Sequence, residues 1–228
     1  MRLACLQRGA FVSFPKSIVK GANPRERVRI YPTIALTVTV LLVCGIPAYG
    51  LETPQEAVKG MVDEVVGILK NDELKGAART EERRSLLEVA VGRRLDYAEM
   101  AKRTLALHWR ERTPAEQKEF VELFHRFLSK TYAHRLERYS QEEVRYEKVR
   151  VKDSYSEVQT IVASAKTEIS MDYRLMLKDS RWWIYDIVVD GVSLVKNYRD
   201  QFERIIRSSS YAELVVKLRE RSEEIANP

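Results

Sequence analysis

Residues 169–191 read ISMDYRLMLKDSRWWIYDIVVDG, a run in which apolar side chains recur at every second position. From Ile169 to Leu177 the odd positions are apolar, and most of the positions between them are polar, which is the period of a strand with one buried face. The polar residues 178–181 predict a short hairpin loop. After the loop, the apolar odd positions 183–189 predict a second strand that ends at Asp190-Gly191.

Two segments before this run show the same alternation. Residues 144–151 predict one strand, with an irregularity between Tyr146 and Val149, and residues 158–162 predict another. Short turns separate all four segments, which favours an antiparallel meander. In the last strand, the alternation places Trp183, Tyr185, Ile187 and Val189 on one face.

Helical patterns flank the meander on both sides. Thr53-Pro54-Gln55-Glu56 and Thr113-Pro114-Ala115-Glu116 are capping boxes with proline at the first helical position. Apolar spacing then predicts helices over residues 54–71, 81–93, 96–109, 113–132, 194–207 and 211–225. The expected fold class is α+β, a four-stranded antiparallel meander wrapped by helices, with an N-terminal helical lobe. The lobe spans residues 53–138, and the sheet with its closing helices spans residues 144–226.

The first 50 residues have the composition of an export leader. Basic residues end at Arg29, and the nearly uncharged run IALTVTVLLVCGI follows at 34–46, short for a membrane span and suited to a signal-peptide core. Small residues before Leu51 predict cleavage after Gly50, and an uncleaved anchor is the alternative. Some thirty residues precede the apolar run, so translation from Val28 is a further hypothesis. The domain proper is then residues 51–228.

The charge of the chain is concentrated in this leader. It holds seven of the 39 basic residues and one of the 33 acidic residues, which leaves 32 of each in the body. A body without net charge offers no general attraction for nucleic acid. Both cysteines, Cys5 and Cys44, also lie in the leader, so the body has no disulfide and no thiolate nucleophile.

Catalytic and metal-binding motifs are missing from the body. The histidines His108, His125 and His134 form no metal-ligand spacing, and no phosphate-binding glycine loop or nucleophile elbow is present. Asp186 is unusual because it lies between apolar Ile184 and Val188. We expect it to bind a helix N-terminus, a turn or an arginine rather than to catalyse, because acid–base chemistry needs a placed partner. The chain is therefore not expected to be an enzyme.

Three stretches resemble the MlaC (toluene-tolerance) family. They are YAEMAKRTL at 97–105, TPAEQ at 113–117 with EFVELF after it, and WIYDIVVDGVSLV at 183–195, and the likeness extends in order over residues 53–218. Asp190 stands where a glutamate is common, and Trp182 adds a second tryptophan. The resemblance implies an NTF2/cystatin-like scaffold with lipid acyl chains between sheet and helices.

The resemblance also implies a role and partners. Its members are periplasmic carriers of phospholipid between the two membranes of a Gram-negative envelope, with no cofactor besides the lipid cargo. The implied partners are an inner-membrane ABC transporter with an MCE-domain ring and an outer-membrane lipoprotein–porin complex. A monomer is expected. Hopanoid is the alternative cargo.

A carrier needs more apolar lining than its own core requires, because each exposed methylene of a lipid costs about 0.8 kcal/mol. Two walls are expected, one from the sheet and one from the helices with Phe120 and Tyr198. The candidate lipid-binding residues are Met100, Phe120, Phe124, Leu128, Tyr132, Val144, Tyr146, Val158, Thr160, Val162, Ile169, Met171, Tyr173, Leu175, Trp183, Tyr185, Ile187, Tyr198 and Phe202.

Periodicity alone does not separate such a wall from an ordinary packed core, which is the simpler interpretation of the same residues. An enzyme on the same scaffold and an interaction module with a solid core are the competing classes. An enzyme would need a polar acid–base pair inside the pocket, and an interaction module would carry no lipid.

Overall fold

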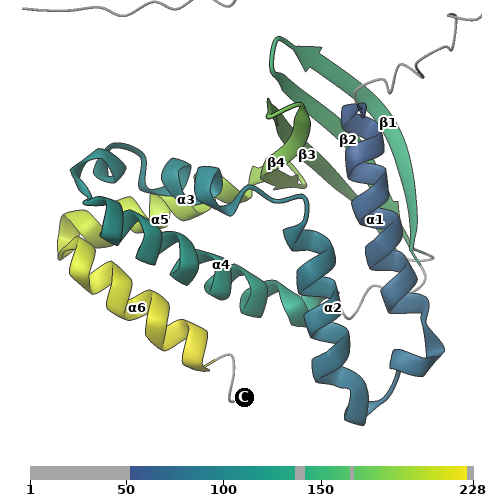
Figure 1. The fold of residues 1–228 in the computed structure, drawn as a ribbon, viewed down its shortest axis with the longest axis horizontal. Coiled ribbons are helices and arrows are strands. Elements are labelled where there is room, and N and C mark those ends of the chain that lie inside the picture. Colours follow the sequence, from purple (N-terminus) through teal and green to yellow (C-terminus); the bar gives the residue numbers. More distant parts are fainter. Residues whose placement is uncertain (1–51, 137–141, 165–166, 225–228) are drawn as a thin grey trace, which may run out of the picture. The chain divides into compact units, whose positions relative to one another are not determined.

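The computed structural model describes residues 52–136, 142–164 and 167–224, so the predicted leader lies outside the described residues. The helices are α1 (Pro54–Lys70), α2 (Thr80–Gly92), α3 (Tyr97–Leu105), α4 (Pro114–Leu136), α5 (Leu194–Ser208) and α6 (Tyr211–Glu224), and 3-10 segments lie at Asp72–Leu74, Ala77–Arg79 and Ala106–Glu111. Figure 1 shows their order along the chain. Within the described residues, no helix is both long enough and apolar enough to cross a membrane.

Local hydrogen bonds explain where the helices begin. Thr53 and Glu56 form a reciprocal capping box at the start of α1, and Thr113 and Glu116 make the same pair of bonds before α4. The third helix is shorter than expected and ends at Leu105. Ala106 after it has φ 50°, outside the helical region, and the chain continues as a 3-10 turn.

The sheet is an antiparallel meander in the order β1-β2-β3-β4-β5. Its strands are β1 (Glu143–Lys152), β2 (Tyr155–Ala163), β3 (Glu168–Lys178), β4 (Arg181–Val189) and β5 (Val192–Ser193). The register between β1 and β2 shifts between Tyr146 and Val149, which confirms the predicted irregularity. The two-residue strand β5 was not predicted, and it pairs with the end of β4 as the chain turns into α5.

A second bulge corrects the predicted face of β4. Arg174 pairs with Asp186, but Leu175 pairs with Ile184, so β4 carries Tyr185 as an extra residue. Paired residues place their side chains on the same side of a sheet, and a bulge resets the alternation. Ile187 therefore shares a face with Tyr173, whereas Trp183 lies on the opposite one. The prediction of a single face from 183 to 189 was wrong for this reason.

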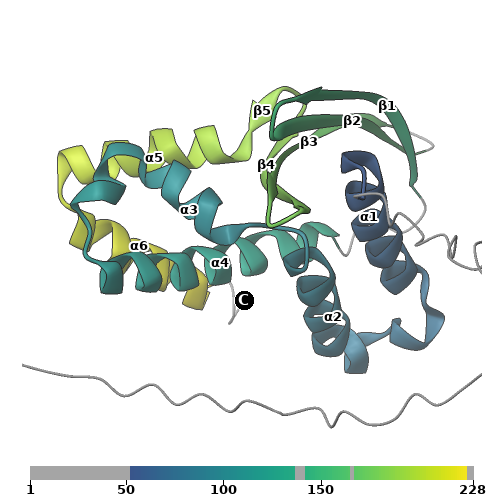
Figure 2. The same ribbon diagram turned by 45° about the horizontal axis from the view of Figure 1, so that its top comes forward.

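The helices pack in two groups. Figure 2 shows the sheet curving over α1, which contacts β2 and β4 and runs beside α2. The second group is formed by α3, α4, α5 and α6, in which α4 packs on α6 and α3 on α5. The long helix α4 also contacts α2, so it connects the two groups. Helices α3 and α4 thus pack with the closing helices α5 and α6.

Candidate functional site

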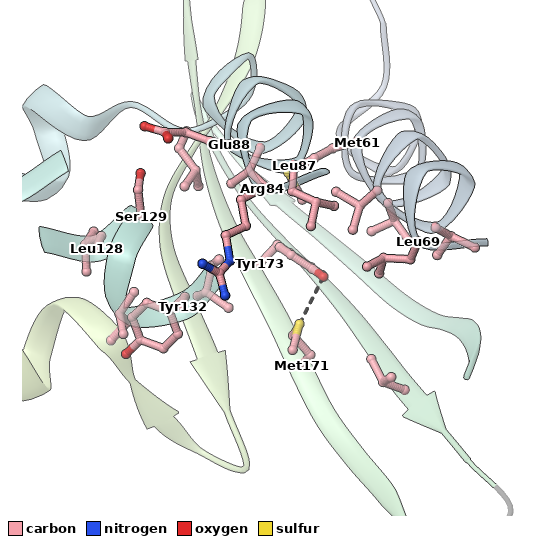
Figure 3. Close-up of a pocket in the computed structure, with 18 of the residues that line it drawn as sticks. Met61, Leu69, Arg84, Leu87, Glu88, Leu128, Ser129, Tyr132, Met171 and Tyr173 are labelled. Carbon is pink, nitrogen blue, oxygen red and sulfur yellow. Dashed lines mark hydrogen bonds between the residues drawn. The ribbon is translucent and has the colours of Figure 1, made fainter. Parts of the chain in front are cut away.

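A cavity of about 600 Å³ lies between the sheet, α1, α2 and the second half of α4 (Figure 3). Its apolar lining comprises Met61, Val62, Val65, Val66 and Leu69 of α1, Leu87 and Val91 of α2, Leu95, Met100, Leu128, Val144, Val162, Met171, Ile187, Val189 and Leu194. Volumes of 300–1,000 Å³ with mainly hydrophobic walls are typical of small-molecule sites in proteins.

The sheet forms one wall of the cavity. Val162, Met171 and Ile187 come from three neighbouring strands, and the bulge in β4 puts Ile187 on this side. Tyr173 lies between them and is buried. Its hydroxyl donates a hydrogen bond to the sulfur of Met171 at 3.1 Å, and burial raises its pKa. The sheet wall is thus apolar, with its polar atom satisfied internally.

Helix α1 forms the opposite wall. Its apolar residues recur at three- and four-residue spacing over most of its length, so one continuous face turns toward the sheet. Val58 and Ala57 on this helix are fully buried, whereas Val65 and Val66 are partly exposed because they border the cavity. The helix therefore borders the cavity with the part that runs from Met61 to Leu69.

The polar lining is concentrated on α2 and α4. Glu81, Arg84, Ser85 and Glu88 come from α2, and Ser129 and Lys130 come from α4. The guanidinium of Arg84 lies 2.8 Å from the carboxylate of Glu81. This side of the cavity carries most of the charged side chains of the lining, so it can hold a charged or hydrogen-bonding group.

An aromatic pair borders the polar side. The rings of Tyr97 and His125 lie 4.0 Å apart, and Nε2 of His125 is 3.4 Å from the carboxylate of Glu88. Burial raises the pKa of Tyr97 to about 12, although a hydrogen bond with Ser129 acts in the opposite direction. Tyr97 is therefore neutral at physiological pH and is a hydrogen-bonding group, not a base.

Eight of the nineteen candidate residues line the cavity. They are Met100, Leu128, Tyr132, Val144, Val162, Met171, Tyr173 and Ile187. They come from α3, α4 and the strands β1, β2, β3 and β4, and their role in lipid binding stays a prediction. The other eleven lie outside the lining.

The predicted aromatic wall is one of the differences. Phe120, Phe124, Tyr198 and Phe202 pack against one another between α4 and α5, with ring centroids 5.6–6.1 Å apart. All four are buried, and the two phenylalanines of α4 are fully enclosed. They form the solid core of the second helical group, so their expected place in the cavity wall is corrected. Aromatic packing of this kind leaves no room for a ligand.

Because of the bulge in β4, Trp183 and Tyr185 do not lie on the face of the sheet that lines the cavity. The guanidinium of Arg181 lies 4.6 Å from the ring of Trp183, and that of Arg103 lies 4.1 Å from the ring of Tyr185. Both rings thus pack under arginines on the outer face of the sheet. Their expected place in the cavity is corrected as well.

The remaining five candidates lie in the sheet without lining the cavity. Val158, Thr160 and Leu175 are almost fully buried, and the hydroxyl of Thr160 donates to the carbonyl oxygen of Met171 at 2.7 Å. Ile169 lies near the start of β3 and Tyr146 lies beside the bulge in β1. Both are partly buried, and burial raises the pKa of Tyr146 to about 12.

The sequence pattern missed the contribution of α1 and α2. The apolar residues of α1 were visible as a helical stripe, but a stripe that faces a cavity has the same period as one that faces a packed core. Helix α2 gave a weaker signal, because four charged residues in a row, 81–84, occupy its start.

Asp186 has the structural role expected of it. Its carboxylate accepts hydrogen bonds from the backbone N–H of Val195 at 3.0 Å, from the hydroxyl of Ser193 at 2.6 Å and from Arg174 at 3.2 Å. It fixes the start of α5 on the sheet. Among the described residues, no group of three or more His, Cys, Asp or Glu side chains could hold a metal ion.

Two of three comparisons with known proteins find a match. A family model described as MlaC protein matches residues 59–220. The comparison with curated proteins finds no match. Among solved structures, a phospholipid-binding protein from Ralstonia solanacearum, determined in complex with a phospholipid, is 26% identical, with a TM-score of 0.69. The match covers 76% of this chain and 98% of that chain.

Proposed function

Because the chain belongs to the MlaC family, we propose that it is a lipid carrier, and not an enzyme, that encloses the acyl chains of a phospholipid in its cavity. One observation carries the proposal, namely a hollow of about 600 Å³ whose walls are apolar on the sheet side and the α1 side. The similar protein from Ralstonia solanacearum holds a phospholipid, which supports the same class of ligand.

The energetics favour this use of the cavity. A diacyl lipid has on the order of thirty methylenes, and their exposure to water costs about 25 kcal/mol at 0.8 kcal/mol each. A soluble carrier must shield most of this length, so it needs space that its own side chains do not fill. Met61, Met171 and Met100 suit such a lining because methionine adapts its shape to different chains.

Loading requires a movement rather than a covalent step. Helices α1 and α2 are joined by 3-10 turns around Gly76, which has φ 111°, a conformation suited to glycine. We expect these two helices to part from the sheet when lipid enters or leaves. The direction of transfer then follows from the relative affinities of the donor and the acceptor.

The proposed setting is the periplasm. The composition of the leader supports export with cleavage after Gly50, and N-terminal sequencing of the exported protein would test that position. The proposed partners are an inner-membrane ABC transporter with an MCE-domain ring and an outer-membrane lipoprotein–porin complex, between which a monomeric carrier moves lipid. They rest on membership of the family alone.

Lipid transfer between vesicles tests the carrier role. Donor vesicles contain a self-quenching fluorescent phosphatidylethanolamine, acceptor vesicles lack it, and the purified protein is added to both. We expect fluorescence to rise in proportion to protein concentration. A rate equal to that of vesicles alone, measured with protein that retains its native circular dichroism, would contradict the proposal.

A further inference from the structure

Most of the charged side chains of the cavity lining lie on α2 and α4, and the others are Lys70 of α1 and Glu142, which precedes β1. The sheet and most of α1 contribute apolar side chains, whereas α2 and α4 contribute Arg84, Glu88, Ser129 and Lys130. Burying a charged head group against the apolar walls would be costly. A lipid in this cavity therefore has its tails toward the sheet and its head group between α2 and α4.

Among the basic residues of the lining, Arg84 is the one best placed to meet a head group on this side of the cavity. Figure 3 shows its guanidinium extending from α2 toward the middle of the residues that line the cavity. Its side chain is only 27% exposed, although the residue lies on a charged helix. A surface arginine would ordinarily extend into water, so this orientation places a positive charge where a ligand can meet it.

The ion pair between Arg84 and Glu81 can be exchanged for one with a ligand. Its guanidinium pairs with Glu81, whose side chain is 87% exposed. An ion pair with a largely solvated carboxylate contributes little to stability. A phosphate offers several oxygens in the geometry that a guanidinium binds through two parallel hydrogen bonds. Phosphate is thus a stronger partner for Arg84 than Glu81 is.

The other two basic residues of the lining are less suitable. The ammonium group of Lys130 donates to the backbone carbonyl of Ser222 at 3.0 Å, which directs it toward α6. Lys70 is in the last turn of α1 and is exposed.

We infer that Arg84 binds the phosphate of the cargo and thereby selects phosphate-bearing lipids over neutral lipids with the same acyl chains. This inference rests on the proposed function. It assigns a specificity-determining residue, and it excludes a neutral polycyclic lipid as the preferred cargo. Because a lone phosphate contact does not distinguish head groups beyond the phosphate, phosphatidylethanolamine and phosphatidylglycerol are both accepted.

Competition between lipids tests the inference. The purified protein is incubated with vesicles that contain phosphatidylglycerol, phosphatidylethanolamine and diacylglycerol, all with identical acyl chains, and bound lipid is counted by native mass spectrometry. Arg84→Gln removes the charge, and Arg84→Lys keeps it without the paired donors. Arg79→Gln is the matched control, because Arg79 precedes α2, pairs with exposed Glu82 and lies outside the cavity.

We expect the wild type to prefer both phospholipids to diacylglycerol, and Arg84→Gln to lower that preference about tenfold or more, the usual effect of losing a charged hydrogen bond. Arg84→Lys should lie between them, and Arg79→Gln should match the wild type. An unchanged preference in Arg84→Gln, or an equal loss in Arg79→Gln, would overturn the inference while lipid binding itself stands. A wild type that takes up none of the three lipids would overturn the proposed function.

Discussion

Single polar residues fix how the sheet and the helices meet. Asp186 is 4% exposed, and its carboxylate accepts bonds from a backbone N–H, a hydroxyl and a guanidinium. A buried carboxylate without such partners would be strongly unfavourable. Its position between apolar neighbours in the sequence predicted a structural partner, and the structure supplies three.

Asp186→Ala removes the acceptor for all three groups. We expect the free energy of unfolding to fall by about 3 kcal/mol, because the N–H of Val195 and the hydroxyl of Ser193 lose their partner inside the protein. Urea unfolding followed by circular dichroism measures the change. The control is Asp200→Ala, which removes an exposed carboxylate on α5 that pairs with Lys196 and should change stability by less than about 0.5 kcal/mol. Equal effects of the two variants would refute the assigned role of Asp186.

Because of Tyr97, the free energy of unfolding should depend on pH in the alkaline range. Burial raises its pKa from 10.0 to about 12, so the native state holds this proton more tightly than the unfolded state. The stabilisation is fully present below pH 10 and is lost as the pH rises toward about 12. We expect Tyr97→Phe to flatten this part of the curve of unfolding free energy against pH. The exposed Tyr155→Phe is the control, and a curve for Tyr97→Phe as steep as that of the control would contradict the expectation.

At the scale of the elements, the sheet is one wall and α1 the other. A larger side chain on the sheet wall should occupy space that the lipid needs. Met171→Trp is expected to lower the amount of lipid per folded chain by at least about half, because its side chain points into a cavity of about 600 Å³. Val151→Trp places the same residue at an exposed position of β1 and should leave the lipid content unchanged.

Lipid content is measured by solvent extraction and mass spectrometry against protein concentration, and circular dichroism confirms that both variants fold. The placement of the cavity would be wrong if Met171→Trp carried as much lipid as the wild type.

The aromatic cluster of α4 and α5 should behave in the opposite way. Phe124→Leu removes ring contacts with Phe120, Tyr198 and Phe202 inside a packed core. We expect unfolding to become easier by roughly 1–2 kcal/mol, with no change in lipid per folded chain. Thermal unfolding and lipid extraction on the same sample separate the two effects. If Phe124→Leu lost lipid but kept its stability, Phe124 would line the cavity and the assignment to the packed core would be wrong.

The sequence predicted the elements better than it predicted their faces. Helix starts were readable because Thr53 and Thr113 begin capping boxes, which depend only on neighbours in the chain. The face of β4 was not readable, because the bulge at Tyr185 exists only relative to β3. A shift of one residue in register moves a whole set of side chains to the other face.

The site was predicted in part for a related reason. Met171, Tyr173 and Val162 were found because a one-sided strand leaves few choices for its buried face. Phe120 and Phe124 were misplaced, since apolar periodicity reports burial and does not tell a packed core from the lining of a cavity. Only the tertiary arrangement shows that α1, and not the aromatic half of α4, lies across from the sheet.

In the molecule as a whole, the buried apolar residues form two sets, a packed core and the lining of a cavity. The cluster around Phe120 and Phe124 is packed and holds α3, α4, α5 and α6 together. The space between the sheet and α1 is left open, although an empty apolar cavity is destabilising in proportion to its volume. Acyl chains would fill this space and remove that penalty, so lipid binding should also stabilise the fold.

Solvent extraction of the purified wild-type protein, with mass spectrometry of the extract, tests this account most directly. We expect phospholipid in a ratio near one molecule per chain, and a higher unfolding temperature for the loaded protein than for the delipidated one. Protein that yields no lipid, and that neither takes up phospholipid from vesicles nor gains stability when they are added, would contradict it.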